Sequence, residues 1–391
     1  MPGRRPLAEV FGVALRLGLT SFGGPIAHIG YFRREYVERR RWLDEGAFSE
    51  LVAVTNLLPG PSSSQLGMAI GAHRAGRLGG LAAWLGFTLP SAIAMTVLAL
   101  WVGAADVSDE GWVHGLELVA APVVALAVLA MWRNLAPDVG RSVVAVTAAA
   151  IVLGVGGFGG QAAALALGTV VGIAVYRRGA RAPTLHVAFH GHRVQAIACL
   201  TALAALLLGL PALANATDRH AVALVGAMVR AGSLVFGGGH VVLPLLYQGV
   251  AAPGWVSQNE FFAGYGLAQA MPGPLFTFSA YLGAIQEPGP NGVAGASIAL
   301  GAIYLPSFLL LGGVLPLWSS IREHAVVQSA LTGIGAAVVG LLAAALIDPV
   351  LTTSVDEVGD AVFALALLPL VRFLPIWIVV PLAAAAGAVV F

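Results

Sequence analysis

Long apolar segments follow one another along the chain and predict a protein built from membrane helices. Twelve of them form two sets of six, at about 7–30, 46–72, 79–102, 113–132, 142–158 and 161–176, and at about 221–246, 260–285, 293–316, 326–347, 361–372 and 374–391. A thirteenth, at about 194–213, lies between the two sets. Most approach the roughly 20 residues that a helix needs to span the ~30 Å hydrocarbon core of a bilayer. Backbone groups in lipid need internal partners, and the alternation of a membrane β-barrel is absent, so we predict an all-α polytopic membrane protein.

The order of short motifs shows that the sequence is duplicated. In each half an arginine precedes Phe-Gly-Gly by six residues, and a later tryptophan precedes Pro-Gly-Pro by seventeen. The matching pairs are Arg16 and Arg230, Phe22 and Phe236, Trp42 and Trp255, Pro59-Gly60-Pro61 and Pro272-Gly273-Pro274, Leu89-Pro90-Ser91 and Leu305-Pro306-Ser307, and Trp101 and Trp318. We therefore predict a first transporter-like repeat over 1–180, a basic linker with one extra span over 181–215, and a second repeat over 216–391.

The placement of charge predicts that the two repeats have opposite orientations in the membrane. Basic residues favour the cytoplasmic side of a membrane protein. The stretches 31–45 and 73–78 are rich in arginine, whereas their counterparts at 247–259 and 286–292 contain none. Inverted repeats of this kind are typical of alternating-access transporters. Two arrangements stay open: the segment at 46–72 is re-entrant or broken, or all thirteen segments cross fully.

The composition removes several classes of function. Only 10% of residues are charged, 58% are hydrophobic and the mean hydropathy is +0.88. All 20 basic residues are arginine, so a P-loop lysine and a Schiff-base lysine are both excluded. Cys199 is the single cysteine, which excludes an internal disulfide or a cysteine metal cluster. No zinc-protease or serine-hydrolase motif occurs. We expect no enzyme, no cofactor, no metal site and no nucleic-acid partner, and no cleavable signal before the first span.

The Pro-Gly-Pro elements predict broken helices that form a substrate site. Proline lacks an amide donor and disfavours a helical conformation in the residue before it, so each apolar segment divides into two half-helices. A helix N-terminus inside the membrane presents free N–H groups and partial positive charge to an anion. A structural kink is the alternative. The predicted binding residues at these breaks are Pro59, Gly60, Pro61, Ser62, Ser63, Ser64, Gln65, Gln269, Pro272, Gly273, Pro274 and Thr277.

Charged residues within apolar segments supply the other candidates. Two arginines in apolar helices are costly unless they are functional, and their planar groups can bind the oxygens of a tetrahedral dianion; the alternative is an arginine that reaches the membrane interface. Beside them lie glycine-rich interruptions. These candidate binding residues are Arg16, Arg230, Gly23, Gly24, Gly237, Gly238 and Gly239. For proton coupling we propose Glu50, which would pair with an arginine in the empty carrier, with His28 and His240 next; a fixed salt bridge is the alternative for Glu50.

These same stretches resemble the chromate ion transporter (CHR) family in its long, two-repeat form. The resemblance rests on Phe22–Phe32, Trp42-Leu43, Leu58–Gln65 and Gly86–Ser91 in the first repeat, and on Phe236–Pro244, Gly254-Trp255 and Ala263–Thr277 in the second. It implies efflux of chromate across the inner membrane, driven by the proton motive force and conferring chromate resistance, with sulfate as a related oxyanion. A proton-coupled importer of sulfate or a small organic anion is the alternative. The oligomeric state, with a homodimer among the options, stays open.

Overall fold

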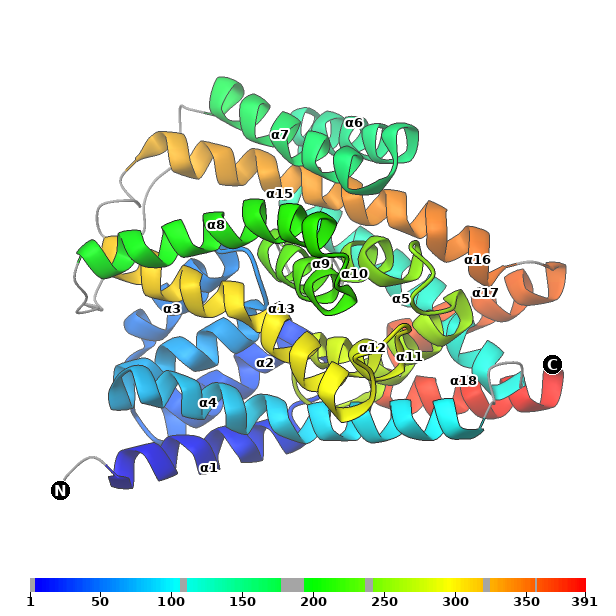
Figure 1. Cartoon of the computed structure of the whole chain (residues 1–391), viewed down its shortest axis with the longest axis horizontal. Helices are drawn as coiled ribbons and strands as arrows, with labels where there is room; N and C mark the ends of the chain where they lie inside the picture. Colours follow the sequence, from blue (N-terminus) through cyan, green and yellow to red (C-terminus); the bar gives the residue numbers. More distant parts are fainter. Residues whose placement is uncertain (1–3, 106–110, 177–192, 236–241, 319–323, 356) are drawn as a thin grey trace. The chain divides into compact units, whose positions relative to one another are not determined.

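A computed structural model describes residues 4–105, 111–176, 193–235, 242–318, 324–355 and 357–391. Within these ranges the chain is helical almost throughout and has no β-strand (Figure 1). Each of the thirteen apolar segments is mostly helical in its described part, which confirms the all-α polytopic architecture. Six stretches in these ranges are long and apolar enough to cross a membrane, namely Ser62–Gly103, Gly111–Leu135, Gly157–Val175, Arg193–Thr217, Gly292–Leu317 and Ala325–Leu351.

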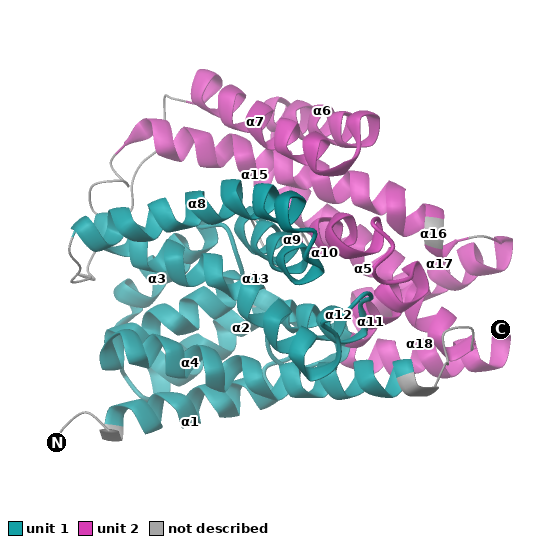
Figure 2. Ribbon diagram, in the orientation of Figure 1, with its two compact units in different colours: residues 1–105, 183–239, 268–318 teal, residues 106–182, 240–267, 319–391 magenta. Residues whose placement is uncertain are grey.

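The chain forms two compact units, and each unit combines segments from both halves of the sequence (Figure 2). Unit 1 contains residues 1–105, 183–239 and 268–318, and unit 2 contains residues 106–182, 240–267 and 319–391. Both Pro-Gly-Pro elements therefore belong to unit 1. The compact units are a different division of the chain from the two sequence repeats, because each repeat supplies helices to both.

Unit 1 repeats one helical arrangement with matching elements from the two halves. Its elements are α1 (Arg4–Thr20), α2 (Gly24–Phe32), the π-helix η1 (Arg33–Arg39), α3 (Glu45–Leu57), α4 (Ser62–Ala105), α8 (Arg193–Thr217), α9 (His220–Leu234), the 3-10 turn η4 (Leu275–Thr277), α12 (Phe278–Ile285), α13 (Gly292–Val314) and the 3-10 turn η5 (Leu315–Leu317). In the first repeat α1 packs on α4, and in the second α9 packs on α13. Asp44 starts α3 by accepting a hydrogen bond from the Ala47 N–H at 2.7 Å.

The helix α4 is two helices joined at a sharp kink. Ala75 and Gly76 leave the helical conformation, and Gly76 has a φ of +68°. The two arms approach closely, because a Cβ on Gly71 would lie 2.4 Å from the carbonyl oxygen of Gly79. The second repeat has the same close approach, where a Cβ on Gly283 would lie 2.3 Å from the Gly295 carbonyl oxygen. In both repeats the half-helix after Pro-Gly-Pro thus turns back onto the next helix.

Unit 2 consists of helices that pack through small residues. It contains α5 (Gly111–Leu135), α6 (Val139–Val155), α7 (Gly157–Val175), α10 (Val242–Leu246), the π-helix η3 (Tyr247–Ala251), most of α11 (Gln258–Ala270), α15 (Ala325–Ala345), the π-helix η6 (Leu346–Leu351), α16 (Thr352–Ser354), α17 (Val358–Phe373) and α18 (Ile376–Val390). α7 and α6 pack on α15, and α18 and α17 pack on α5. Small residues at such crossings let helix backbones approach closely in lipid.

Candidate functional site

Each Pro-Gly-Pro element breaks its helical segment, as predicted. In the first repeat α3 ends at Leu57, Gly60 has a φ of +118°, and α4 begins at Ser62. In the second repeat α11 ends at Ala270, Gly273 has a φ of +92°, and a 3-10 turn at Leu275 leads into α12. These positive φ values favour glycine strongly. The second half-helix of the first repeat therefore starts as a regular α-helix, whereas that of the second repeat starts with a tighter turn.

Within unit 1, each Pro-Gly-Pro break forms a backbone hydrogen bond to the other repeat, and the two bonds are equivalent. The Gly60 N–H donates to the Val235 carbonyl oxygen at 2.6 Å, and the Gly273 N–H donates to the Ser21 carbonyl oxygen at 2.8 Å. Ser21 and Val235 are equivalent, because each directly precedes Phe-Gly-Gly. Each glycine thus bonds to the residue that precedes the Phe-Gly-Gly motif of the other repeat. Contacts exchanged in this way are the kind that a twofold relation produces.

Buried polar side chains surround the first break. Gln65 is fully buried, and its Nε2 group donates to the Pro59 carbonyl oxygen at 2.7 Å and to Ser307 Oγ at 3.2 Å. Among the described residues its Oε1 atom has no hydrogen-bond partner. Ser64 Oγ lies 3.3 Å from the hydroxyl of buried Tyr304. A buried acceptor without a partner is costly in an apolar setting, so the Oε1 atom marks a place where a hydrogen-bond donor such as a water molecule can bind.

His28 connects the glycine-rich break after α1 to the helix that starts at Ser62. It is buried, with Nε2 3.2 Å from the Ser21 carbonyl oxygen and Nδ1 3.1 Å from Ser63 Oγ. A carbonyl oxygen only accepts, so Nε2 carries the proton, and in the neutral ring Nδ1 accepts from the Ser63 hydroxyl. The Ser21 carbonyl oxygen therefore accepts from both His28 and Gly273. These hydrogen bonds connect the break between α1 and α2 to both Pro-Gly-Pro elements.

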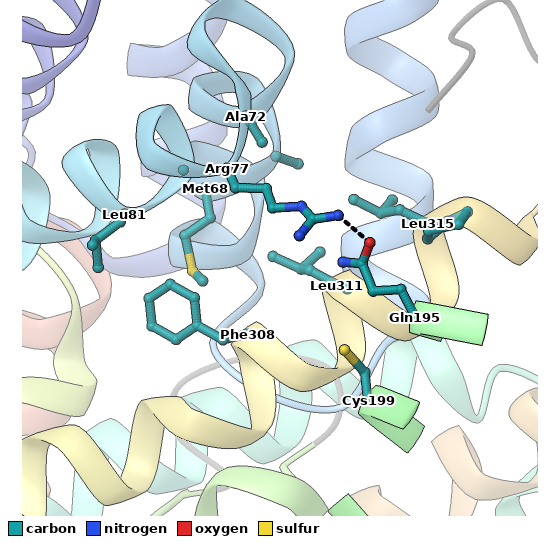
Figure 3. Close-up of a pocket in the computed structure, with 13 residues that line it drawn as sticks. Met68, Ala72, Arg77, Leu81, Gln195, Cys199, Phe308, Leu311 and Leu315 are labelled. Atoms are coloured by element: carbon teal, nitrogen blue, oxygen red, sulfur yellow. Dashed lines mark hydrogen bonds between the residues drawn. The ribbon is translucent and has the colours of Figure 1, made fainter. Parts of the chain in front are cut away.

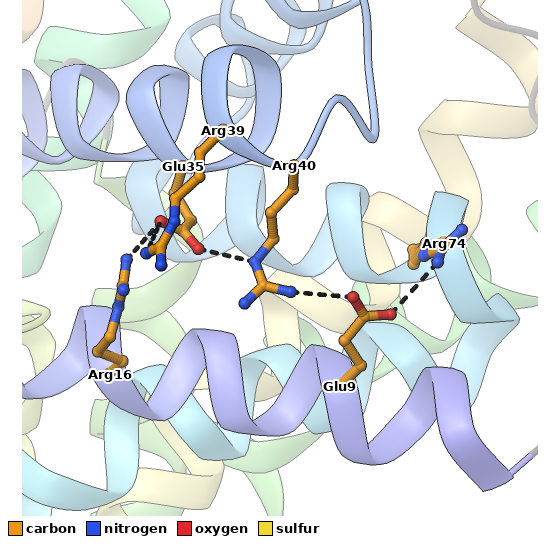
Figure 4. A network of polar contacts seen from close by, with 6 residues as sticks. All are labelled: Glu9, Arg16, Glu35, Arg39, Arg40 and Arg74. Carbon is orange, nitrogen blue, oxygen red and sulfur yellow. Dashed lines mark hydrogen bonds and ion pairs between the residues drawn. The ribbon is translucent and has the colours of Figure 1, made fainter.

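Arg16 lies away from these serines in an ion-pair network on the polar stretch after α2 (Figure 4). Its guanidinium pairs with Glu35, whose carboxylate also accepts from Arg40 at 2.7 Å and from Arg39 at 3.3 Å. Arg40 continues to Glu9 at 2.9 Å, and Arg74 reaches Glu9 at 3.2 Å. The network holds η1 and the kink of α4 against α1.

Glu35 is the centre of this network. It is buried with 3% exposure, while Arg16 and Arg39 keep about half of their side-chain surface accessible. Burial alone would raise the pKa of the Glu35 carboxyl, but the hydrogen bond from Arg40 and the charges of the surrounding arginines outweigh it and hold the pKa below its ordinary value. Glu35 therefore stays ionised at neutral pH and supplies the countercharge for Arg16. Glu35 is not among the site residues predicted from the sequence.

The remaining candidates are placed as follows. Arg230 is half-buried on α9, one turn before that helix ends, and its repeat has no carboxylate in η3. Glu50 is buried on α3. Thr277 is buried and donates to the Pro274 carbonyl oxygen at 2.9 Å, and Gln269 is half-buried near the end of α11. Gly23 and Gly24 have positive φ values and separate α1 from α2. Gly237, Gly238, Gly239 and His240 lie outside the described residues.

Three polar residues at the breaks were missed from sequence. Ser307 and Tyr304 contact Gln65 and Ser64, and the carbonyl group of Ser21 accepts two hydrogen bonds. Ser307 carried a usable signal, because it belongs to the duplicated Leu-Pro-Ser motif. Its counterpart Ser91 is close to the other break, where a Cβ on Gly273 would lie 3.0 Å from Ser91 Oγ. The motif is thus a component of both breaks as well as a marker of the repeat.

This arrangement suits recognition of a small anion. The first turn of the helix from Ser62 leaves the N–H groups of Ser62, Ser63 and Ser64 without intrahelical acceptors. A partial positive charge at that end favours an anion. The serine hydroxyl groups add buried polar atoms at this helix start. Within the described residues no cluster of metal-binding side chains occurs.

Comparison with known sequences identifies relatives over nearly the whole chain. The sequence model of a family described as "Chromate transporter" matches twice, at residues 8–217 and 222–389. The two matches confirm that the sequence is duplicated, and the first extends to residue 217, across the stretch 181–215 that we predicted as a linker. No solved structure matches the chain.

The individual relatives align with this chain over most of their own length. A "Chromate transport protein" of Pseudomonas aeruginosa is 30% identical over 92% of this chain and 86% of that protein. A protein of the same name from Cupriavidus metallidurans is 26% identical, over 90% of this chain and 84% of its own length. An "Uncharacterized transporter" of Methanocaldococcus jannaschii is 24% identical over 87% of this chain and 83% of that protein. These relatives are transport proteins in name, and with the six long apolar helices they indicate a multi-pass membrane protein.

Proposed function

The chain belongs to the chromate transporter family, and from this membership we propose that it exports chromate across the cell inner membrane, driven by the proton motive force. An inside-negative potential of about 100 mV is worth about 2.3 kcal/mol per charge. Exit of a dianion is therefore favoured by roughly 4.6 kcal/mol, whereas import would need more than two co-transported protons. Sulfate, another tetrahedral dianion, is the natural competitor for the site.

The pair of Pro-Gly-Pro breaks supports this proposal most strongly. Transporters commonly bind substrate where half-helices meet inside the membrane. Here the helix start at Ser62 presents free N–H groups beside the buried hydroxyl groups of Ser62 and Ser64. We propose that the oxyanion binds to the N–H groups of this turn and to the hydroxyl groups of Ser62 and Ser64, because the Ser63 hydroxyl donates to His28. Arg16 would join the site by exchanging its Glu35 partner for the oxyanion, and Arg230 would contribute from the second repeat.

Flux of radiolabelled chromate tests the proposal and the role of the arginines together. In inside-out vesicles the cytoplasmic face points outward, so export appears as uptake into the vesicle. The wild-type protein should therefore accumulate chromate in these vesicles, and added sulfate should compete with chromate for uptake. Arg16→Gln and Arg230→Gln should each lower the rate at least tenfold, since each removes a charge-assisted contact worth ~1.5–3 kcal/mol. Arg16→Lys should fall between them and the wild type, because it keeps the charge but loses the planar fork.

Arg141→Gln is the control for this assay. Arg141 is paired with Asp138 at 2.6 Å at the start of α6, away from the proposed site in sequence. The Arg141→Gln protein should transport chromate at the wild-type rate. A correctly inserted Arg16→Gln or Arg230→Gln protein that matches the wild-type rate would remove that arginine from the site. Accumulation only in right-side-out vesicles would make the protein an importer.

We further propose that the two repeats are inverted relative to each other. The reciprocal bonds of Gly60 and Gly273 are compatible with a twofold relation, and the arginine bias predicts its orientation in the membrane. In a background lacking Cys199, Arg34→Cys should react with a membrane-impermeant maleimide only from the cytoplasm. Glu287→Cys should react only from outside; both positions are exposed. Reaction of both from the same side would refute inversion.

We propose that Glu50 couples transport to protons. It is a buried carboxylate on the half-helix that leads into the first Pro-Gly-Pro, and acidic residues within membrane segments often form proton relays. Glu50→Gln should bind oxyanion with normal affinity but lose acceleration by an imposed pH gradient. Glu45→Gln, an exposed acid on the same helix, should keep it. Full gradient dependence in Glu50→Gln would move coupling to His28 or His240.

A further inference from the structure

A cavity of about 270 Å³ lies in unit 1, apart from the Pro-Gly-Pro breaks (Figure 3). Three helical segments form its walls: the two arms of α4 around the kink, α8, and the end of α13 with η5. α13 contributes Phe308, Leu311 and Gly312, whose spacing places them on one face of the helix. α8 contributes Gln195 and Cys199, which are one turn apart. Apart from these two and Arg77, the lining residues are apolar.

The chemistry of the walls favours an apolar occupant. An ordered buried water needs two to four polar partners, and among the lining side chains only Arg77 and Gln195 offer strong hydrogen-bonding groups. In a bilayer, the apolar material available to fill such a space is a lipid acyl chain.

The helices that form the cavity present apolar side chains to their surroundings. On α8, Val194 is 79% exposed and Ile197 is 59% exposed. On α4, Leu78 is 63% exposed and Leu81, which itself lines the cavity, is 39% exposed. In a membrane protein such surfaces face lipid rather than water. Leu81 both lines the cavity and is exposed, so the cavity reaches the surface of unit 1 at this side chain.

Arg77 gives this apolar space an anion-binding group. Its guanidinium reaches across to the Gln195 side chain and donates a hydrogen bond to Oε1 (Figure 3). Arginine has five N–H donors, and this is the one hydrogen bond recorded for Arg77 in the described part of the chain. Over the same residues Arg77 has no carboxylate within ion-pair distance, whereas its neighbour Arg74 is paired with Glu9. The charge of Arg77 is thus available to a phosphate.

We propose that this cavity binds an anionic phospholipid, with an acyl chain between α4, α8 and α13 and the headgroup phosphate on Arg77. Basic pockets between membrane helices bind anionic headgroups in this way. Gln195 positions the guanidinium, and its own amide N–H groups can donate to the same phosphate. The bound lipid would hold α8, the helix between the two repeats, against the helices on either side of the first kink.

The chain carries its own reporter for this site, because Cys199 lines the cavity and is the single cysteine. The full-length protein is placed in nanodiscs of phosphatidylcholine, with or without phosphatidylglycerol, and alkylation of Cys199 by N-ethylmaleimide is timed by mass spectrometry. Phosphatidylglycerol should slow alkylation roughly five-fold, as expected when the reactive, empty state falls to about a fifth of the population. Arg77→Gln should react at one rate in both lipids.

Arg219→Gln is the matched control, because Arg219 is also an exposed arginine of unit 1 but does not line the cavity. It should keep the full lipid effect. Ala72→Phe, which fills the cavity, should slow alkylation equally in both lipids and so tests the site even if Arg77→Gln fails to fold. Equal wild-type rates in the two lipids would overturn the proposal. So would protection by soluble glycerol phosphate or by sulfate in phosphatidylcholine alone, since the site would then bind a free anion.

Discussion

Glu35→Gln is expected to lower the free energy of unfolding by about 3 kcal/mol, near the lower end of what removal of one partner from a buried ion pair costs. The buried carboxylate accepts from Arg40 on one oxygen and from Arg16 and Arg39 on the other. The glutamine amide keeps one acceptor oxygen, but its NH₂ group replaces the other oxygen and faces arginine N–H groups, which are also donors. Three guanidinium groups then lose their common countercharge. The thermal unfolding midpoint of the purified protein, measured at a fixed heating rate, should fall by several degrees.

A control and a pH series distinguish this network from ordinary surface charge. Glu38→Gln removes a half-exposed acid of the same stretch, paired with Arg33 at 2.6 Å, and should change stability by less than about 1 kcal/mol.

The pKa of Glu35 is lowered in the folded protein. Its stabilising effect is therefore complete above the ordinary pKa of a glutamate and is lost as the pH falls through the lowered value. Wild type and Glu35→Gln should differ at neutral pH and converge in acid; equal shifts in Glu35→Gln and Glu38→Gln would contradict this account.

The helix breaks were predictable from sequence because their cause is local. A proline removes one donor and restricts its neighbour wherever it occurs, so Pro-Gly-Pro identified both interruptions, and Gly23-Gly24 identified a third. The paired motifs likewise revealed the duplication, which the two matches of the family model confirm. Local rules also place Ser62 at a helix start, where a hydroxyl-rich first turn is common.

The partners of these residues were not predictable, because they come from distant parts of the chain. The bond from Gly273 to Ser21 joins the second repeat to the first, and the bond from Gln65 to Ser307 does the same. Neither hydrogen bond corresponds to a periodicity or a residue spacing that could be recognised in the sequence. Glu35 was missed for a related reason. An arginine-rich stretch was interpreted as a topology signal, and the single buried carboxylate that organises it depends on how η1 folds back onto α1.

Gly60→Ala is expected to abolish high-affinity oxyanion binding. At a φ of +118° an added Cβ is strained by ~1–2 kcal/mol. It would also lie 2.5 Å from Gln65 Nε2 and 2.9 Å from Ser307 Oγ, closer than real Cβ atoms approach. Gln65 must then move and lose its bonds to Pro59 and Ser307, at about 1 kcal/mol each. Because Gln65 lies in the first turn of the proposed site, its displacement should also remove a charge-assisted contact between this turn and the oxyanion, worth ~1.5–3 kcal/mol. The dissociation constant should therefore rise roughly tenfold to a hundredfold, measurable by equilibrium binding of labelled chromate.

Two comparisons isolate the contact with Gln65 from backbone strain. Gly76→Ala is the matched control, because Gly76 also has a positive φ, +68°, but has open space where the Cβ would lie. It should lose some stability and bind oxyanion normally. Gln65→Ala removes the side chain that the new Cβ would displace, so the double variant Gly60→Ala/Gln65→Ala should bind only slightly more weakly than Gln65→Ala alone. Fully additive losses would show that Gly60 acts through its backbone, independently of Gln65, and normal binding in Gly60→Ala would remove the first Pro-Gly-Pro break from the oxyanion site.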